Sequence, residues 1–201
     1  MKTKEFFNEY IKVFLSQNEK LNLVSKNDEK YLWEKHIYDS LSIEKFFERY
    51  IDSLKDKKLL DIGTGGGFPS VPTAMCYPEL QVYALDSIRK KIGAIESIKS
   101  DLKIENLHTI CDRVENISQK FDIITSRAVA SLKILVEYAI PLLKNDGYFV
   151  AYKSLKVDEE IKDAKNILNK YNAEIIDTIN YDLPLIENFT RKLVIIKSKV
   201  K

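Results

Sequence analysis

The stretch "DIGTGGGFPSVP", residues 61–72, gathers most of the chain's glycine into one turn. Four of the six glycines in the protein fall at positions 63, 65, 66 and 67. Glycine adopts positive φ values without a steric penalty and lets a ligand approach the backbone closely. The run "KLLDIG" before the turn has the pattern of a buried strand, and a helix is expected after it. A glycine-rich turn between a strand and a helix predicts a nucleotide-type binding site.

The spacing of the glycines narrows the class of ligand. Dinucleotide-binding turns follow the pattern G-x-G-x-x-G, but Phe68 occupies its third glycine position here. Gly63, Gly65 and Gly67 instead follow the G-x-G-x-G spacing typical of S-adenosylmethionine-dependent methyltransferases. Asp86 ends the next apolar run, about 20 residues after the turn, where a carboxylate accepts hydrogen bonds from ribose hydroxyls. S-adenosylmethionine is therefore the expected cofactor. A purely structural turn with a helix-capping Asp86, or a nicotinamide site, remains as an alternative.

Short apolar runs and helical segments alternate from residue 58 onward. We expect strands at residues 58–63, 81–86, 107–111, 121–125 and 147–153, the last after an Asn-Asp-Gly turn. We expect helices at 87–102, 131–143 and 157–171, and an antiparallel pair of strands at 173–182 and 191–199. This alternation predicts an α/β fold with a mostly parallel, doubly wound sheet of the Rossmann-like class I methyltransferase type, carrying an antiparallel C-terminal strand.

The first 50 residues carry helical patterns without intervening strand patterns. Apolar side chains recur at helical spacing over residues 4–17 and again over 31–47, with a polar break at 18–30 between them. We therefore expect residues 1–50 to form a helical extension packed on the core. Residues 58–201 are expected to form the methyltransferase domain.

Composition and charge place few limits on the partners. The formal net charge is only +2, so bulk charge does not indicate a nucleic-acid-binding protein. The two cysteines, Cys76 and Cys111, lack metal-ligand spacing, and no metal site is expected. No run approaches the length of a membrane span, and the chain does not begin with the pattern of a secretory signal. We expect a cytoplasmic protein without a membrane partner.

The residues after the fourth expected strand disfavour two classes of methyl acceptor. The stretch "SRAVASL", residues 126–132, lacks the Asp/Asn-Pro-Pro-aromatic signature of methyltransferases that act on amino groups. Methyltransferases that act on pyrimidine carbon 5 need a nucleophilic cysteine, and neither Cys76 nor Cys111 lies near this position. The glycine turn alone does not choose among the remaining acceptors.

Further sequence blocks occur in a fixed order, namely "LNLVSKND", "KHIYDSL", "DIGTGGGFPSVP", "LDSIRKK", "RVEN", "SRAVASL" and "YKS". With these blocks, from about residue 10 to the C-terminus, the chain resembles the RsmG (GidB) family of bacterial methyltransferases. The resemblance implies methylation of guanine N7 in small-subunit ribosomal RNA, with that RNA or a ribosomal particle as partner. We expect a monomer. Two other classes stay open, a small-molecule methyltransferase and a ribosome-binding module without activity.

Together with the glycine spacing, the resemblance implies roles for individual residues. The expected cofactor-binding residues are Gly63, Gly65, Gly67, Phe68, Asp86, Val114, Glu115 and Arg127, of which Val114 and Glu115 lie at the adenine. The residues expected to face RNA are Lys90, Arg113, Lys153 and His36. Arg127 is the one expected catalytic residue, and its role is positioning. Guanine N7 carries a free lone pair and no proton, so its methylation needs no general base.

The resemblance extends to the N-terminal region and includes one departure. Asn22, His36 and Asp39 fall in the N-terminal motifs of the family. Ser70 stands where the family commonly has glycine, at the expected entry of the helix that follows the turn.

Overall fold

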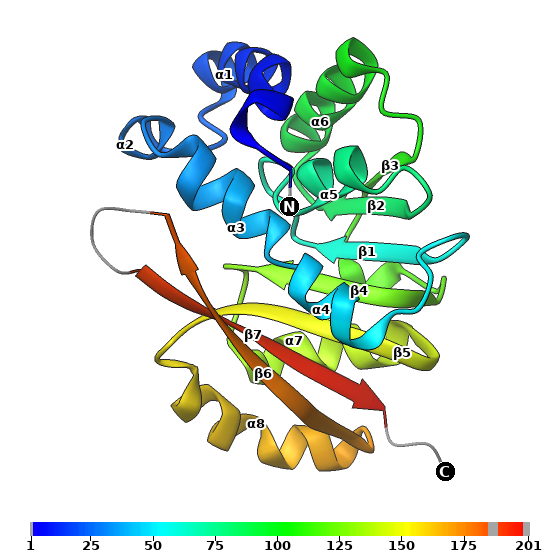
Figure 1. Ribbon diagram of the computed structural model, residues 1–201. Helices are drawn as coiled ribbons and strands as arrows, with labels where there is room; N and C mark the ends of the chain where they lie inside the picture. Colours follow the sequence, from blue (N-terminus) through cyan, green and yellow to red (C-terminus); the bar gives the residue numbers. More distant parts are fainter. Residues whose placement is uncertain (1, 185–188, 199–201) are drawn as a thin grey trace.

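The computed structural model describes residues 2–184 and 189–198. Within these residues seven strands form one sheet in the order β3-β2-β1-β4-β5-β7-β6 (Figure 1). The parallel strands are β1 (Lys58–Ile62), β2 (Gln81–Asp86), β3 (Leu107–Cys111), β4 (Phe121–Arg127) and β5 (Leu143–Ser154). The antiparallel strands at the edge are β6 (Ala173–Leu183) and β7 (Phe189–Ser198), with β7 between β5 and β6. The expected fold class and the antiparallel C-terminal pair are confirmed.

The strand order reverses at β1, which pairs with β2 on one side and β4 on the other. In open parallel sheets, ligands bind outside the carboxyl ends of the strands at such a reversal. The glycine turn follows the carboxyl end of β1, so the topology places it where a ligand site is expected.

Helices cover both faces of the sheet (Figure 1). One face packs against α1 (Asn8–Leu21), α3 (Asp39–Leu41), α4 (Glu44–Tyr50), α5 (Ser70–Cys76) and α6 (Arg89–Leu102). The other face packs against α7 (Leu132–Ala139) and α8 (Val157–Lys170). Successive residues of one strand serve opposite faces, since Leu59 belongs to the first core cluster and Leu60 to the second. Coverage of both faces explains why the parallel strands read as continuous apolar runs.

The N-terminal region differs in detail from the two expected helices. α1 follows a short 3-10 turn, Lys4–Phe7, and continues to Leu21, well into the expected polar break. Asn18 is polar but only 1% exposed, and its side-chain oxygen accepts a hydrogen bond of 2.8 Å from the Val24 backbone. Because its side chain has a backbone partner, Asn18 can be buried within the helix. The pattern of apolar residues alone indicated that the helix ended before it.

The second expected N-terminal helix is divided into several pieces. The break contains a short helix, α2 (Lys26–Glu29), whose cap Ser25 accepts a hydrogen bond from the Asp28 backbone. A π-helical segment, Leu32–Tyr38, then leads into α3 and α4. π-Helical turns are rare and are often found at functional sites.

Two element boundaries in the second half of the chain differ from the expected ones. α7 ends at Ala139 and a 3-10 turn follows, Ile140–Leu142, because Pro141 has no backbone N–H to continue the α-helix. β5 begins at Leu143, so the Asn-Asp-Gly segment lies inside the strand as a local irregularity, with Asp146 at a φ of 62°. Residue 199, the last residue of the final expected strand, lies outside the described residues.

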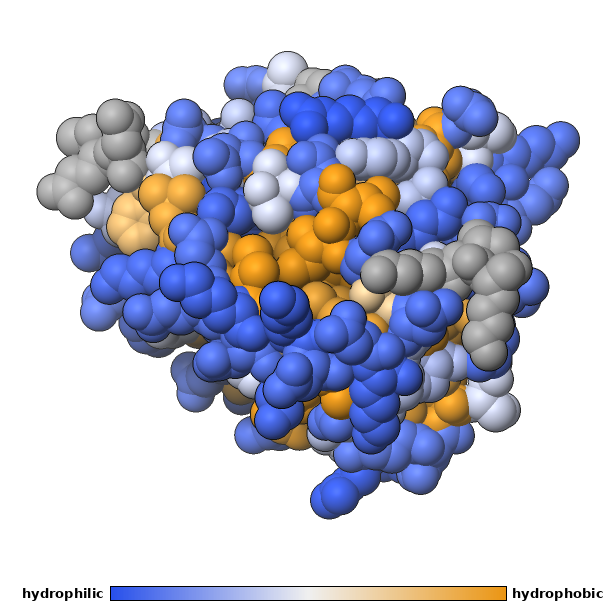
Figure 2. Space-filling view, turned by 90° about the horizontal axis from the view of Figure 1, so that it is seen from below, coloured by the Kyte–Doolittle hydropathy of each residue, from blue (hydrophilic) through white to orange (hydrophobic). Residues whose placement is uncertain are grey.

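The lower face in Figure 1, which α8 borders, is largely hydrophilic, with an apolar area in its middle (Figure 2). Among the described residues, no helix has both the length and the hydropathy that a membrane crossing requires.

Candidate active site at the carboxyl ends of the strands

A cavity of about 1300 Å³ opens at the carboxyl ends of the parallel strands. This volume exceeds the roughly 300–1,000 Å³ of ordinary small-ligand pockets. The predicted site residues that line it are Gly63, Gly65, Phe68, Asp86, Arg113, Val114, Glu115, Arg127, Lys153 and His36. Two other predicted residues, Gly67 and Lys90, are not among its lining residues.

The three glycines of the G-x-G-x-G pattern all have positive φ, but they serve different purposes. A Cβ added to Gly65, at φ +60°, would have only the Gly63 carbonyl oxygen nearby, at 3.9 Å. A Cβ on Gly67 would lie 2.6 Å from Val71 Cγ2, inside the packing of α5. Gly65 therefore exposes backbone to the cavity, whereas Gly67 allows the helix to pack closely against the turn.

Asp86 stabilises the glycine turn as well as facing the cavity. One carboxylate oxygen accepts a hydrogen bond from the Gly65 backbone at 3.0 Å, and the other accepts one from the Ile88 backbone at 2.9 Å. Lys91, which was not predicted, lies 3.8 Å from the first oxygen. A carboxylate offers about four lone-pair directions, so Asp86 retains acceptor capacity for a pair of hydroxyl groups.

A buried polar layer lies beneath the turn. Asp61 is fully buried, and its side chain accepts a hydrogen bond of 3.0 Å from the Thr125 hydroxyl. Burial raises the pKa of Asp61 to about 7, although hydrogen bonds from Thr64 and Thr125 act in the opposite direction. The Ser70 hydroxyl is hydrogen-bonded to the Thr64 hydroxyl, so the serine that departs from the family pattern gains a partner within the turn.

The segment after β3 carries an acid that the sequence analysis missed. Asp112 lines the cavity and accepts hydrogen bonds of 2.7 Å from the Arg113 backbone and from the Asn116 side chain. These bonds hold the short 3-10 turn Val114–Asn116, in which Val114 is half-buried and Glu115 is exposed. The available signal was the position of Asp112 directly after a strand, as Asp86 ends its own strand.

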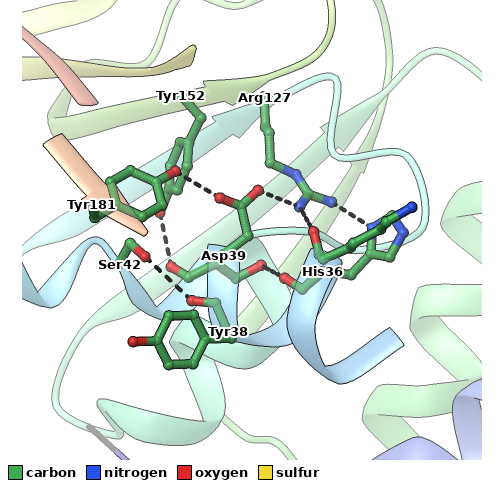
Figure 3. Close-up of polar contacts among 9 residues, drawn as sticks. His36, Tyr38, Asp39, Ser42, Arg127, Tyr152 and Tyr181 are labelled. Carbon is green, nitrogen blue, oxygen red and sulfur yellow. Dashed lines mark hydrogen bonds and ion pairs between the residues drawn. The ribbon is translucent and has the colours of Figure 1, made fainter. Parts of the chain in front are cut away.

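Arg127 is the centre of a side-chain network that joins β4 to the N-terminal region (Figure 3). Its Nη1 atom donates to Asp39 Oδ2 at 2.8 Å and to the Lys35 carbonyl at 3.1 Å. Its Nη2 atom lies 3.0 Å from His36 Nδ1. The guanidinium also lies over the Phe68 ring, 5.3 Å from its centroid. Arg127 thus connects the end of β4, the π-helical segment and the glycine turn.

The network continues from Asp39 to the antiparallel edge of the sheet. The Tyr181 hydroxyl donates to Asp39 Oδ1 at 2.6 Å, and Asp39 is only 3% exposed (Figure 3). The Tyr152 hydroxyl donates to the Ser40 carbonyl at 2.8 Å. Both oxygens of the buried Asp39 carboxylate therefore have partners, and the N-terminal region is tied to β4, β5 and β6 in one place.

His36 is neutral in this network. Burial, together with the Arg127 guanidinium, lowers the pKa of His36 to about 4. Because Arg127 can only donate, His36 Nδ1 must accept, and the ring proton lies on Nε2. The ring is half-buried and lies 5.1 Å from the Phe68 ring centroid. His36 therefore fills the wall between Arg127 and the glycine turn, and its one lone pair is already used.

The predicted RNA-facing lysines and arginine differ in their surroundings. Lys153 is 10% exposed and is paired with Glu160 at 2.7 Å, whereas Arg113 is exposed at the rim of the cavity. Lys90 is exposed on α6 and is not among the lining residues. Arg191, on β7, lines the cavity without having been predicted, because no local pattern in the chain relates β7 to the glycine turn. Among the described residues, no cluster of side chains could hold a metal ion.

The profile of the family described as rRNA small subunit methyltransferase G (GidB) matches residues 3–182. The chain belongs to this family. A ribosomal RNA small subunit methyltransferase G of Bacillus licheniformis is 36% identical over 201 residues, covering 97% of this chain and 82% of that protein. The protein of the same name from Staphylococcus saprophyticus is 35% identical, covering 91% of this chain and 77% of that protein. The match to the family profile begins before residue 10 and ends at residue 182, whereas the resemblance was expected from about residue 10 to the C-terminus.

Solved structures with little sequence identity show the same fold. A ribosomal protein L11 methylase from Lactobacillus delbrueckii subsp. bulgaricus superposes with a TM-score of 0.59 at 18% identity, covering 81% of this chain and 77% of that chain. An rRNA methylase from Streptococcus thermophilus superposes with a TM-score of 0.55 at 19% identity, covering 78% and 96%. One is named for a protein and the other for an RNA, so the fold alone does not indicate the methyl acceptor.

Proposed function

We propose that this protein transfers a methyl group from S-adenosylmethionine to guanine N7 in small-subunit ribosomal RNA. Membership of the rRNA small subunit methyltransferase G family carries the choice of substrate. The geometry that supports it is a single cavity bordered by the glycine turn, Asp86 and Arg127. The protein would act as a monomer in the cytoplasm, where ribosomal subunits are found.

The residues around the turn fit the proposed cofactor. Gly65 exposes its backbone to the cavity, and Asp86 has acceptor capacity left for the two ribose hydroxyls. Val114 and Glu115 lie on the turn after β3 and line the same cavity, and we assign them to the adenine side of the cofactor. When bound, S-adenosylmethionine supplies a methyl group on a positively charged sulfur, which an uncharged lone pair can attack.

Methylation of guanine N7 requires the protein to position the base, and the contacts of Arg127 suit that role. Guanine N7 carries no proton to be removed, so a general base is not required. Arg127 donates to the Lys35 carbonyl and to Asp39, and so holds the Lys35–Asp39 segment against the end of β4. His36 is neutral, with its acceptor nitrogen already bonded to Arg127. Arg127 therefore shapes the acceptor side of the cavity without exchanging a proton.

A labelling experiment tests the function. The protein is incubated with methyl-labelled S-adenosylmethionine and either small-subunit RNA, assembled small subunits or a metabolite extract, and the labelled atom is mapped. Label on guanine N7 of the RNA, in the free or assembled state, supports the proposal. Label only in the metabolite extract indicates a small-molecule methyltransferase. Binding to small subunits without any label indicates a binding module.

A pH–rate comparison tests the role of Arg127. We expect Arg127→Ala to lower the methylation rate by a similar factor at every pH from 6 to 9. The loss of a titrating limb in the variant's profile would contradict the positioning role.

A further inference from the structure

One charged contact holds the loop that follows β4. Glu160, on α8, accepts a hydrogen bond of 2.7 Å from the Leu132 backbone, at the start of α7. The same carboxylate oxygen lies 2.7 Å from Lys153 Nζ. Lys153, on β5, also donates to the Ala130 carbonyl at 2.8 Å. We call these four residues, Ala130, Leu132, Lys153 and Glu160, the loop clamp.

The clamped loop lies directly over the glycine turn. Val129, at its tip, is 44% exposed, and Ala128 before it has a φ of 57°. A Cβ added to Gly63 would lie 2.5 Å from Val129 Cγ2, so the valine packs on the first glycine of the turn. Residues 127–131 all line the cavity. The loop therefore borders both the turn that is expected to hold the cofactor and the space left for the acceptor.

The ammonium group of Lys153 is largely buried and contacts other members of the loop clamp. The side chain of Lys153 is 10% exposed, and that of Glu160 is 35% exposed. Two of the three ammonium protons of Lys153 are engaged, one by a carboxylate and one by a carbonyl. Only one ammonium proton is left for a phosphate, and the Glu160 carboxylate beside it would repel that anion. This arrangement favours a role for Lys153 toward the loop over a direct contact with RNA.

We propose that Lys153 and Glu160 are positioning residues that set the 128–131 loop for the incoming acceptor base, and that Lys153 does not bind an RNA phosphate. This inference rests on the proposed function, because it concerns the acceptor side of the same cavity. A misplacement of about 1 Å at a reacting centre costs roughly 10²-fold in rate. A shift of Ala130 would move Val129, because the two residues are adjacent in the chain.

Activity measurements with matched variants test the proposal. With saturating small subunits, we expect Glu160→Ala and Lys153→Met to lower kcat by about 10- to 100-fold. Glu160→Gln should stay within about threefold of the wild type, because its amide oxygen still accepts both hydrogen bonds. Cofactor affinity should change less than about twofold in all three variants. Glu159→Gln is the control, since Glu159 lies in the same first turn of α8 and is exposed. It loses the same favourable charge at the helix N-terminus without touching the clamp.

The salt dependence of binding separates positioning from a phosphate contact. Each phosphate contact adds about 0.7–0.9 to the slope of log K against log salt concentration. We expect Lys153→Met to keep the wild-type slope for small-subunit binding, while Arg113→Ala reduces it by about one contact. A reduced slope in Lys153→Met with an unchanged kcat would overturn the proposal.

Hydrogen exchange gives a readout that does not depend on activity. The Leu132 amide is itself a member of the clamp, so its exchange rate should rise in Glu160→Ala and stay unchanged in Glu159→Gln. If the wild type is active and Glu160→Ala has unchanged kcat and unchanged Leu132 exchange, the role of the loop clamp is contradicted but the proposed function is not. A wild-type protein that methylates no small-subunit RNA would contradict the proposed function instead.

Discussion

Arg127 Nη1 lies 2.8 Å from Asp39 Oδ2, although 88 residues separate them in the chain. The pair is largely buried, with side-chain exposures of 14% for Arg127 and 4% for Asp39. It joins the end of β4, at the cavity, to the short helices before β1. Both residues of this pair line the cavity, so we expect its removal to lower both stability and activity.

We expect Arg127→Met to lower the free energy of unfolding by about 3 kcal/mol, because it leaves a buried carboxylate without its cation. The matched control is Arg49→Met, whose partner is Asp177 and whose side chain is 54% exposed. That change should cost less than about 1 kcal/mol. Urea unfolding followed by circular dichroism measures both, and equal losses would contradict the assignment.

The pH dependence of stability should report His36. Its folded pKa is about 4, below the value of 6.5 for an ordinary histidine. Between these pH values the unfolded chain binds the proton and the folded chain does not, so the His36 contribution is fully present above pH 6.5 and is lost as the pH falls toward 4. The difference in unfolding free energy between the wild type and His36→Gln should therefore shrink over this range. A difference independent of pH would show that His36 titrates normally in the fold.

Asp61 should make the stability change with pH in the opposite direction. Its folded pKa is about 7, above the unfolded value near 3.9. The folded chain holds the proton between these pH values, so stability relative to Asp61→Asn should fall as the pH rises from 4 through 7. Unfolding midpoints of the two proteins at a series of pH values measure this. A relative stability that increases with pH would indicate a carboxylate that stays ionised in the fold.

The close approach of Gly63 and Val129 predicts a partial rescue. Gly63→Ala should weaken cofactor binding by at least about tenfold, because it combines a strained φ of +69° with a collision against Val129. Adding Val129→Ala removes the collision but leaves the strain, so the double variant should recover only part of the affinity. Binding is measured by calorimetry with S-adenosylmethionine.

Gly93→Ala is the glycine control for that experiment. Gly93 lies inside α6, and a Cβ there would have nothing within 4 Å. The substitution should leave cofactor affinity unchanged and stabilise the helix by about 0.5–1 kcal/mol. Full recovery by Val129→Ala, or a loss of binding in Gly93→Ala, would refute the steric account.

The strands and the glycine turn could be predicted because their signals are local. Buried parallel strands are apolar on both faces, and the turn residues stand out by their conformational freedom. The boundaries of the N-terminal helices were less predictable, since Asn18 is polar in the sequence but buried and bonded in the fold. The Asn-Asp-Gly segment was expected to precede β5, yet pairing of Leu143 with Phe121 extends the strand across it.

The surroundings of the charged site residues could not be read from the chain. Nothing near Lys153 in the sequence indicates that it forms an ion pair with Glu160 on the next helix, α8. The partners of Asp39 lie on β4 and β6, which come together only when the sheet forms. Asp112 is the exception, because its position after a strand was a usable local signal.

The sequence by itself determined the strand–turn–helix unit around Gly63, the acid at the end of β2 and membership of a methyltransferase family. These depend on backbone freedom, periodicity and spacing along the chain, all of which are properties of neighbouring residues. Only the tertiary structure decided that Arg127 bonds Asp39 and that Lys153 bonds Glu160 and the Ala130 carbonyl. A charge selects its partner by distance in space and by burial, and both arise only when remote segments pack together.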